Sequence, residues 1–305
     1  SFIPPFVAQA AMDTGVARKP IEDMDEYRAS LARRLDPTAS FLQGVQNKVR
    51  KEQKRIVFAE GEEPQVVRAA FTFQQQGLGQ AILIGREEQV GRTMAQMGVP
   101  EGSLEIVNAR LSDRNADYTD YLYERLQRKG YLKRDAQRLV NQDRNVFGSC
   151  MLAHGDADGM VTGVTRNYDV CLKDVMLTLD PLPDTQVIGM SMVLNRGKTV
   201  FIADTSVTEL PDGQALADIA KEAAKAVKRL GFTPRVAFVS YSTFGNPMGE
   251  RAEKVRDAVE ILDNCNDVDF EYEGDVSADV AMNPMHKVLY PFSRLPDAAN
   301  VLIMP

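Results

Sequence analysis

The stretch Arg55-Ile56-Val57-Phe58-Ala59-Glu60-Gly61-Glu62-Glu63-Pro64 decides the fold class. Its first five residues form a short apolar run, which is typical of a buried strand. Residues 60–64 have the composition of a turn, and Pro64 suits the first turn of a helix. Beyond the turn, apolar residues recur at helical spacing at Val66, Val67, Ala70 and Phe73. The stretch therefore predicts a buried strand that leads directly into a helix.

The same alternation continues along the chain. Apolar runs predict further strands over 81–85, 104–107, 235–240, 269–273 and 300–304. Amphipathic or Ala-rich runs predict helices over 87–97, 116–153, from 168, over 214–230 and over 250–263. Two runs separated by a turn predict a hairpin over 187–203. Strands that alternate with helices of about ten or more residues indicate βαβ units, so the predicted class is α/β with a mostly parallel sheet.

The length of 305 residues favours two domains. Residues 1–44 carry little apolar surface and are predicted to form a linker or arm, with short helices over 7–17 and 21–35. The Pro-rich segment 181–184 marks a second boundary. The predicted division is therefore 1–44, 45–185 and 186–305. The chain begins without Met and ends inside a strand pattern, so we expect it to be a piece of a longer protein.

Charge and cysteine content exclude several classes of function. A net charge of −7 argues against a general nucleic-acid or anionic-membrane binder. No apolar run reaches the roughly 18 residues that a membrane span needs. The three cysteines show no CxxC spacing, which favours reduced thiols and a cytoplasmic protein. No metal-binding motif, P-loop, GxGxxG fingerprint or nucleophile elbow is present, so no metal site is expected.

The first candidate site is the glycine-rich stretch 154–166, which precedes a predicted helix. Thr162, Thr165 and the backbone N–H groups around Gly163 could hydrogen-bond a polar ligand. Arg166 could bind a negative charge. A Gly/Thr loop that leads into a helix N-terminus suits an anion. The residues alone leave a second interpretation open, which is a tight turn with cap residues.

Two further regions are candidates for ligand contacts. The loop 240–249 follows a predicted strand and carries Ser242, Thr243 and Gly245, which could hold a phosphate or simply form a βα loop. The helical region 116–153 is rich in basic residues, including Arg125 and Arg128. Those side chains could recognise phosphate or could form a solvated helix face.

Six short motifs, in order along the chain, carry a resemblance to a known family. They are Arg55-Ile56-Val57-Phe58-Ala59-Glu60-Gly61-Glu62, Gly155-Asp156-Ala157-Asp158-Gly159-Met160-Val161-Thr162-Gly163, Phe201-Ile202-Ala203-Asp204, Tyr241-Ser242-Thr243-Phe244-Gly245, Glu253-Lys254-Val255-Arg256 and Ala299-Asn300-Val301. With them, residues 54–305 resemble the phosphotransacetylase (phosphate acetyl/butyryl transferase) family. The resemblance implies two α/β/α lobes with a cleft between them, related to the isocitrate/isopropylmalate dehydrogenase fold, and a homodimer or higher homo-oligomer.

The first 22 or so residues resemble the end of a bacterial malic enzyme, in Pro4-Pro5, Val7-Ala8, Ala10-Ala11-Met12 and Gly15-Val16-Ala17. Malic enzyme followed by a phosphotransacetylase-like domain is the arrangement of the hybrid NADP-dependent malic enzymes. The resemblance implies that a malic enzyme domain of the same polypeptide, outside this chain, converts malate to pyruvate and CO2. NADP and a divalent metal, Mg or Mn, would belong to that domain and not to this one.

Active phosphotransacetylases transfer an acetyl group between CoA and phosphate. The resemblance places their catalytic Ser, Arg and Asp beyond residues 299–301, so no catalytic residue is expected in this chain. Two other family arginines fall at Lys173 and Leu126, the latter between Arg125 and Arg128. Lysine lacks the bidentate fork of arginine, and leucine lacks the charge as well. These departures argue against transferase activity. The resemblance to the hybrid malic enzymes implies a regulatory domain that binds acetyl-CoA as an effector without transferring its acetyl group.

Two alternatives stay open, namely an active phosphate acetyltransferase, which makes acetyl phosphate and CoA from acetyl-CoA and phosphate, and a purely structural oligomerisation module. The predicted contacts to acetyl-CoA or phosphate are Thr162, Gly163, Thr165, Arg166, Lys173, Arg125, Arg128, Ser242, Thr243 and Gly245.

Overall fold

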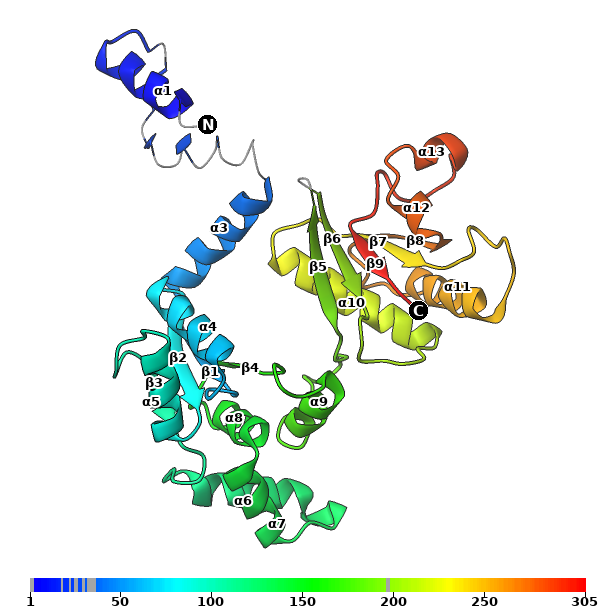
Figure 1. Cartoon of the computed structure of the whole chain (residues 1–305). Coiled ribbons are helices and arrows are strands. Elements are labelled where there is room, and N and C mark those ends of the chain that lie inside the picture. Colours follow the sequence, from blue (N-terminus) through cyan, green and yellow to red (C-terminus); the bar gives the residue numbers. More distant parts are fainter. Residues whose placement is uncertain are drawn as a thin grey trace. The chain divides into compact units, whose positions relative to one another are not determined.

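The computed structural model divides into two compact units (Figure 1). It describes residues 3–17, 19–21, 23–24, 27–28, 31, 37–195 and 198–305. One unit is Gln46–Asp180, and the other combines Ser1–Val45 with Pro181–Pro305. The boundaries predicted from the sequence fall after residues 44 and 185. Each unit has its own sheet and its own hydrophobic core.

The sheet of the unit Gln46–Asp180 is parallel throughout, with strand order β3-β2-β1-β4 (Figure 1). Its strands are β1 (Lys54–Phe58), β2 (Gly79–Ile84), β3 (Glu105–Val107) and β4 (Gly159–Val161). No strand was predicted within 154–166, yet the structure places β4 there. Three residues that begin with glycine show no strand periodicity, and only their pairing with Ile56–Phe58 of β1 makes them a strand.

Helices cover both faces of this sheet. They are α4 (Pro64–Gln75), α5 (Glu87–Gln96), α6 (Asn115–Leu126), the 3-10 helix η1 (Gln127–Lys129), α7 (Lys133–Gln142) and α8 (Arg144–Ala153). Helix α9 (Tyr168–Met176) packs on α8, and α3 (Pro37–Lys51) precedes β1 along the chain. The region predicted as helical over 116–153 is thus broken into several helices. Asp143 starts α8, because its carboxylate accepts the N–H groups of Asn145 and Val146.

The two faces of the sheet follow from strand alternation, since neighbouring residues of a strand point to opposite sides. Phe58 and Leu83 pack against α4 and α5 on one face. Val57 and Ile82 pack against α6, α7 and α8 on the other. The strands therefore lie between two helical layers, and each strand residue named here is nearly or fully buried.

The second unit has a five-stranded mixed sheet with strand order β5-β6-β9-β7-β8. Its strands are β5 (Met190–Asn195), β6 (Lys198–Ala203), β7 (Arg235–Val239), β8 (Glu271–Val276) and β9 (Val301–Ile303). The predicted hairpin is confirmed by the antiparallel β5–β6 pair, whereas every other pair is parallel. The last strand in the chain, β9, inserts between β6 and β7, which no local pattern indicates.

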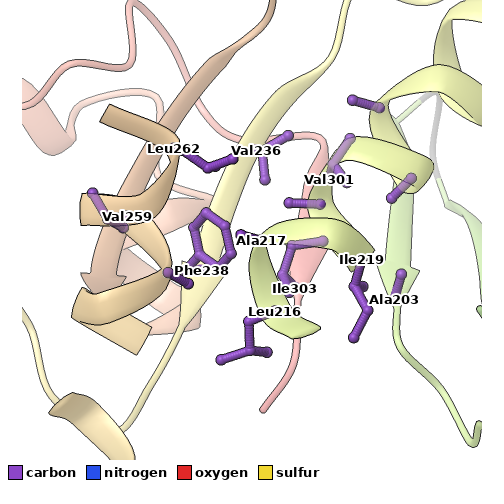
Figure 2. Packing of buried hydrophobic residues seen from close by; sticks show 14 of the residues in the cluster. Ala203, Leu216, Ala217, Ile219, Val236, Phe238, Val259, Leu262, Val301 and Ile303 are labelled. Atoms are coloured by element: carbon purple, nitrogen blue, oxygen red, sulfur yellow. The ribbon is translucent and has the colours of Figure 1, made fainter. Parts of the chain in front are cut away.

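Helices α10 (Gly213–Arg229) and α11 (Glu250–Asp263) pack on one face of this sheet. Figure 2 shows Leu216 and Ile219 of α10 beside Ile303 of β9, with Phe238 of β7 in the same cluster. The other face is covered by α12 (Ala278–Ala281) and the segment that follows it. That segment includes the short helix α13 (His286–Leu289).

The N-terminal helix α1 spans Ile3–Asp13, so it begins and ends earlier than the predicted range 7–17. Pro4 and Pro5 lie in its first turn, where no N–H is needed. The helix predicted over 21–35 lies largely outside the described residues. Among the helices that the structure describes, none has both the length and the apolar character needed to cross a membrane.

Candidate functional site

The carboxyl ends of β1 and β4 are where the chain leaves the parallel sheet in opposite directions. β1 leads to α4 on one face, whereas β4 leads to α9, which packs against α8 of the other helical layer. Ligands of open α/β sheets bind at such points, where the outgoing connections of adjacent strands diverge. The residues that follow β1 and β4 therefore form the candidate site.

The centre of this site is a buried carboxylate. Glu60, which follows β1, is 1% exposed. It accepts the backbone N–H groups of Gly163 at 3.0 Å, Val164 at 2.6 Å and Thr165 at 2.8 Å. The Thr165 hydroxyl donates to it as well. Gly163 has a φ of 104°, a conformation that favours glycine and that turns successive N–H groups toward one point.

The charge of Glu60 is stabilised by these donors. Burial by itself raises the pKa of the Glu60 carboxyl, but the hydrogen bonds from Thr165, Val164 and Gly163 outweigh it and lower the pKa. The loop after β4 is therefore an anion-binding turn that holds an anion of the protein itself. The ligand contacts predicted for Gly163 and Thr165 stay predictions, and their donors already have a partner in this structure.

Thr162 and Arg166 join the same loop to the neighbouring helices. The Thr162 hydroxyl donates to Asn145 at 2.6 Å. Arg166 forms ion pairs with Asp143 at 2.5 Å and with Asp174 at 2.9 Å. Asn145 also donates to Asp174, at 3.0 Å, so the loop, α8 and α9 share one polar network. Both residues are thus anchored, and contacts of either with a ligand remain predicted.

The two aspartates of the stretch 154–166, Asp156 and Asp158, make local contacts. Asp156 accepts hydrogen bonds from Tyr118 at 2.5 Å and from Arg114 at 3.0 Å. Asp158 accepts the N–H of Arg55 at 2.8 Å at the start of β1. Burial raises the pKa of Asp156, while the Tyr118 and Arg114 hydrogen bonds lower it below its usual range. These contacts shape the loop and leave no acid and base pair there.

An apolar hollow of about 470 Å³ adjoins the loop. It is lined by Met160, Val161, Thr162, Gly163, Tyr168, Cys171, Leu172 and Val175. Val161 is 53% exposed, although it lies on a strand, so this wall of the hollow is accessible. The hollow combines apolar side chains with the polar edge at Thr162, which is the usual composition of a small-molecule site.

The predicted basic contacts lie on the surrounding helices. Lys173 is exposed on α9, with its Nζ 3.6 Å from Asp169. Arg125 is held by Asp180 through a fork of 2.7 and 2.8 Å, and also donates to the carbonyl oxygen of Leu177. Arg128 is exposed in η1. Between them, Leu126 is fully buried in the core.

The second predicted loop belongs to the other unit, after β7. Ser242 is fully buried, and its hydroxyl has no hydrogen-bond partner among the described residues. The Thr243 hydroxyl accepts the N–H of Ser277 at 3.1 Å. Gly245 donates its N–H to Asp275 at 3.4 Å. The end of β8 therefore holds this loop, and its role in ligand binding stays a prediction.

Glu60 is the functional group that sequence reasoning missed. It stands directly after a buried strand, and that position is the only signal the sequence offers for its role. Its partners lie more than 100 positions away in the chain. In the described part of the chain, no group of three or more His, Cys, Asp or Glu side chains is placed to bind a metal ion.

The fold and these motifs have counterparts in known proteins. The chain is similar to the NADP-dependent malic enzyme of Rhizobium meliloti, with 57% identity over 307 residues that cover all of this chain and 40% of that protein. It is also similar to the phosphate acetyltransferase of Thermoanaerobacterium thermosaccharolyticum, with 29% identity over 87% of this chain and 83% of that one. The chain thus spans about 40% of the length of the malic enzymes it matches.

A crystal structure of a phosphotransacetylase from Streptococcus pyogenes superposes with a TM-score of 0.80. That structure is 28% identical, and the match covers 88% of this chain and 82% of the other. The predicted α/β class is confirmed, whereas the cleft between lobes and the relation to isocitrate dehydrogenase stay predictions. The model of the phosphate acetyl/butaryl transferase family matches residues 40–305. This chain belongs to the phosphate acetyl/butaryl transferase family.

Proposed function

We propose that this chain is a regulatory domain of a larger NADP-dependent malic enzyme, and that it binds acetyl-CoA without transferring the acetyl group. The malic enzyme relatives support the first part, because they match the chain along its length and extend well beyond it. The observation that carries the binding proposal is the apolar hollow beside the loop after β4.

The hollow suits the acyl end of a thioester. Its Met, Val and Leu side chains provide an apolar wall, and the Thr162 hydroxyl stands at its edge. Burial of an acetyl group and the adjoining chain against such a wall stabilises the complex by about 0.8 kcal/mol per CH2 group. Lys173, on the same helix as Leu172 and Val175, supplies a positive charge for a phosphate of CoA.

Three features support binding without transfer. Glu60 accepts four hydrogen bonds, so its carboxylate is poorly placed to take a proton. No carboxylate or histidine occurs among the described residues that line the hollow. The family arginine expected at position 126 is a leucine buried in the core, so it cannot reach a ligand.

Regulation requires that acetyl-CoA binds two states of the whole protein with different affinity. In this proposal the protein is a homodimer or a higher homo-oligomer in the cytoplasm, and acetyl-CoA favours its inactive state. Conversion of malate to pyruvate and CO2, with NADP and Mg or Mn, takes place in the malic enzyme part. The three free cysteines fit a reducing compartment.

The test uses the full-length malic enzyme polypeptide. Calorimetry measures acetyl-CoA binding, a thioester assay with CoA and acetyl phosphate measures transfer, and NADPH formation measures malate oxidation. We expect binding, inhibition of malate oxidation, and no transfer. Turnover at ordinary enzyme rates would instead identify an active phosphate acetyltransferase, and the absence of binding would leave a structural oligomerisation module.

A matched pair of variants locates the site. Val161 lines the hollow, and Val164 is similarly exposed, at 51% against 53%, but lies outside it. We expect Val161→Gln to weaken acetyl-CoA binding roughly tenfold through lost apolar contact, and Val164→Gln to leave the affinity unchanged. Equal effects of the two substitutions would place the acyl group elsewhere.

A further inference from the structure

A second pocket lies at the carboxyl edge of the same sheet, beyond β2 and β3. Its volume is about 330 Å³. The residues that argue for its chemistry are Glu62, Arg86, Asn108, Arg110, Asn141 and Arg144. They come from four segments, since Glu62 follows β1, Arg86 follows β2, Asn108 and Arg110 follow β3, and the last two lie where α7 meets α8. Glu62 lies two positions after Glu60 of the candidate site, and the other five residues lie outside the residues that follow β1 and β4.

The charge of this pocket is positive. Three arginines and one glutamate among the lining residues leave a net charge of +2. Glu62 forms an ion pair with Arg86, whose Nε and Nη2 each donate a hydrogen bond of 2.9 Å to the Glu62 carboxylate. Within the described residues, Arg110 and Arg144 form no ion pair closer than 4.0 Å. The positive charge of Arg144 helps to lower the pKa of the Glu62 carboxyl, so Arg144 lies near that carboxylate without forming an ion pair with it. The pocket still carries an excess of guanidinium groups over carboxylates.

The loops that carry these groups are held in place by the backbone. Gly85 donates its N–H to Val107 at 3.0 Å, which joins the ends of β2 and β3. A Cβ atom at Gly85 would lie 2.7 Å from Cγ2 of Val90 and 2.9 Å from Cγ of Glu62, so a larger residue there would displace these side chains. Asn108 accepts the N–H of Arg110 at 3.1 Å, and this bond orders the loop after β3.

One polar atom of the pocket lacks a partner. The side-chain oxygen of Asn141 is buried and accepts no hydrogen bond from any described residue. An amide group carries two donor hydrogens as well as an acceptor, so Asn141 can turn its donors toward a bound anion. The unpartnered oxygen is costly in this orientation, and turning the amide would put in its place an N–H group that a bound anion can accept.

We propose that Arg110 and Arg144, with the Arg86–Glu62 pair beside them, bind a diphosphate group. The planar guanidinium fork matches phosphate oxygens in pairs, and two such forks suit two linked phosphates. The volume lies at the lower end of the range for ligand sites, so it holds a diphosphate but not a whole nucleotide. The carboxyl edge of a parallel sheet is the expected location for such a ligand.

This proposal goes beyond the acetyl-CoA function and does not depend on it. The diphosphate could be free, or it could be part of a nucleotide whose remainder lies outside the pocket. The probe is therefore inorganic pyrophosphate, titrated into the full chain by calorimetry at low ionic strength. Competition with ADP then distinguishes the sources, because displacement of pyrophosphate by ADP assigns the group to a nucleotide and no displacement assigns it to a free diphosphate.

Variants decide whether the pocket is responsible. We expect Arg110→Ala and Arg144→Ala each to weaken pyrophosphate binding about tenfold, which is the loss expected for one charge-assisted hydrogen-bonding group. Arg110→Lys keeps the charge and loses the fork, so its affinity should fall between those of the wild-type chain and Arg110→Ala. Thermal unfolding of each variant shows that the fold is retained.

Arg68 is the matched control, because it is an exposed arginine on α4 that forms no ion pair with the described residues and lies outside the pocket. Arg68→Ala should bind pyrophosphate as the wild-type chain does. No detectable binding by the wild-type chain would overturn the proposal. Equal losses in Arg68→Ala and Arg110→Ala would overturn it too, because they would show attraction to the surface charge in general.

Discussion

The carboxylate of Glu60 accepts the backbone N–H of Thr165 at 2.8 Å, and thereby joins the end of β1 to the loop after β4. Two further N–H groups and the Thr165 hydroxyl complete its set of donors. A loop with this geometry binds anions in many proteins. Here the loop binds a side chain of the protein itself, which ties the loop after β4 to the end of β1.

Glu60→Gln tests the importance of that contact for stability. The amide of glutamine would turn a donor toward N–H groups that need an acceptor, and the buried donors would lose a charged partner. We expect the free energy of unfolding to fall by about 1–3 kcal/mol, measured by urea denaturation. The control is Glu101→Gln, at an exposed position. Similar losses in both variants would contradict the role of Glu60.

Glu62 predicts a pH dependence of stability. The hydrogen bond from Arg86, opposed by burial, lowers the pKa of the Glu62 carboxyl from its usual 4.5 to about 2. A carboxyl with a lowered folded-state pKa stabilises the fold above its unfolded pKa and loses that contribution as the pH falls through the folded value. The stabilisation should therefore be complete at pH 7 and decline between about pH 4.5 and 2.

The measurement compares the wild-type chain with Glu62→Gln across this range. The difference in their free energies of unfolding should be largest near neutral pH and should shrink toward pH 2. Glu124→Gln, at an exposed position on α6, should show a small difference that changes little with pH. A difference between wild type and Glu62→Gln that stays constant from pH 7 to 2 would disprove the assignment.

Tyr118→Phe isolates the hydrogen bond to Asp156. Tyr118 is 1% exposed, and its hydroxyl lies 2.5 Å from the Asp156 carboxylate. Burial and the hydrogen bond to Asp156 raise the pKa of Tyr118, so the hydroxyl remains a donor at neutral pH. Loss of a hydrogen bond to a charged group should lower the free energy of unfolding by about 1.5–3 kcal/mol.

Tyr123→Phe is the control for this substitution. Tyr123 lies on the same helix and is half-buried, and its hydroxyl forms no hydrogen bond with the described residues. Chemical denaturation of both variants should show a clear loss for Tyr118→Phe alone. If the two losses are equal, the phenol–carboxylate bond contributes nothing measurable.

Lys173→Glu tests the predicted phosphate contact on α9. The substitution reverses a charge at an exposed position, so it should weaken acetyl-CoA binding roughly tenfold with little change in stability. Lys225→Glu on α10 is the control, because Lys225 is also exposed and also pairs with an acidic residue of its own helix. Calorimetry of the full-length polypeptide measures both. Unchanged affinity in Lys173→Glu would remove this residue from the site.

The sequence predicted most of the elements because their patterns are local. The helix over 250–263 follows from apolar spacing, and the hairpin of β5 and β6 follows from two apolar runs with turn residues between them. Strand β4 was not predicted, because three residues are too few to show a strand pattern and glycine, here Gly159, is rare in strands. The position of β9 between β6 and β7 also lies beyond local pattern, because strand order depends on the packing of the whole unit.

For the candidate site too, some features follow from the sequence and others only from the tertiary structure. The sequence by itself determined the α/β class, the family motifs and the glycine that turns the loop at position 163, because each depends on residue type and short spacing. Only the tertiary structure decided that Glu60 fills that loop, that Leu126 is buried, and that Arg86, Arg110 and Arg144 gather at one edge. Those relationships join residues far apart in the chain, and parallel strands bring them together only when the sheet is complete.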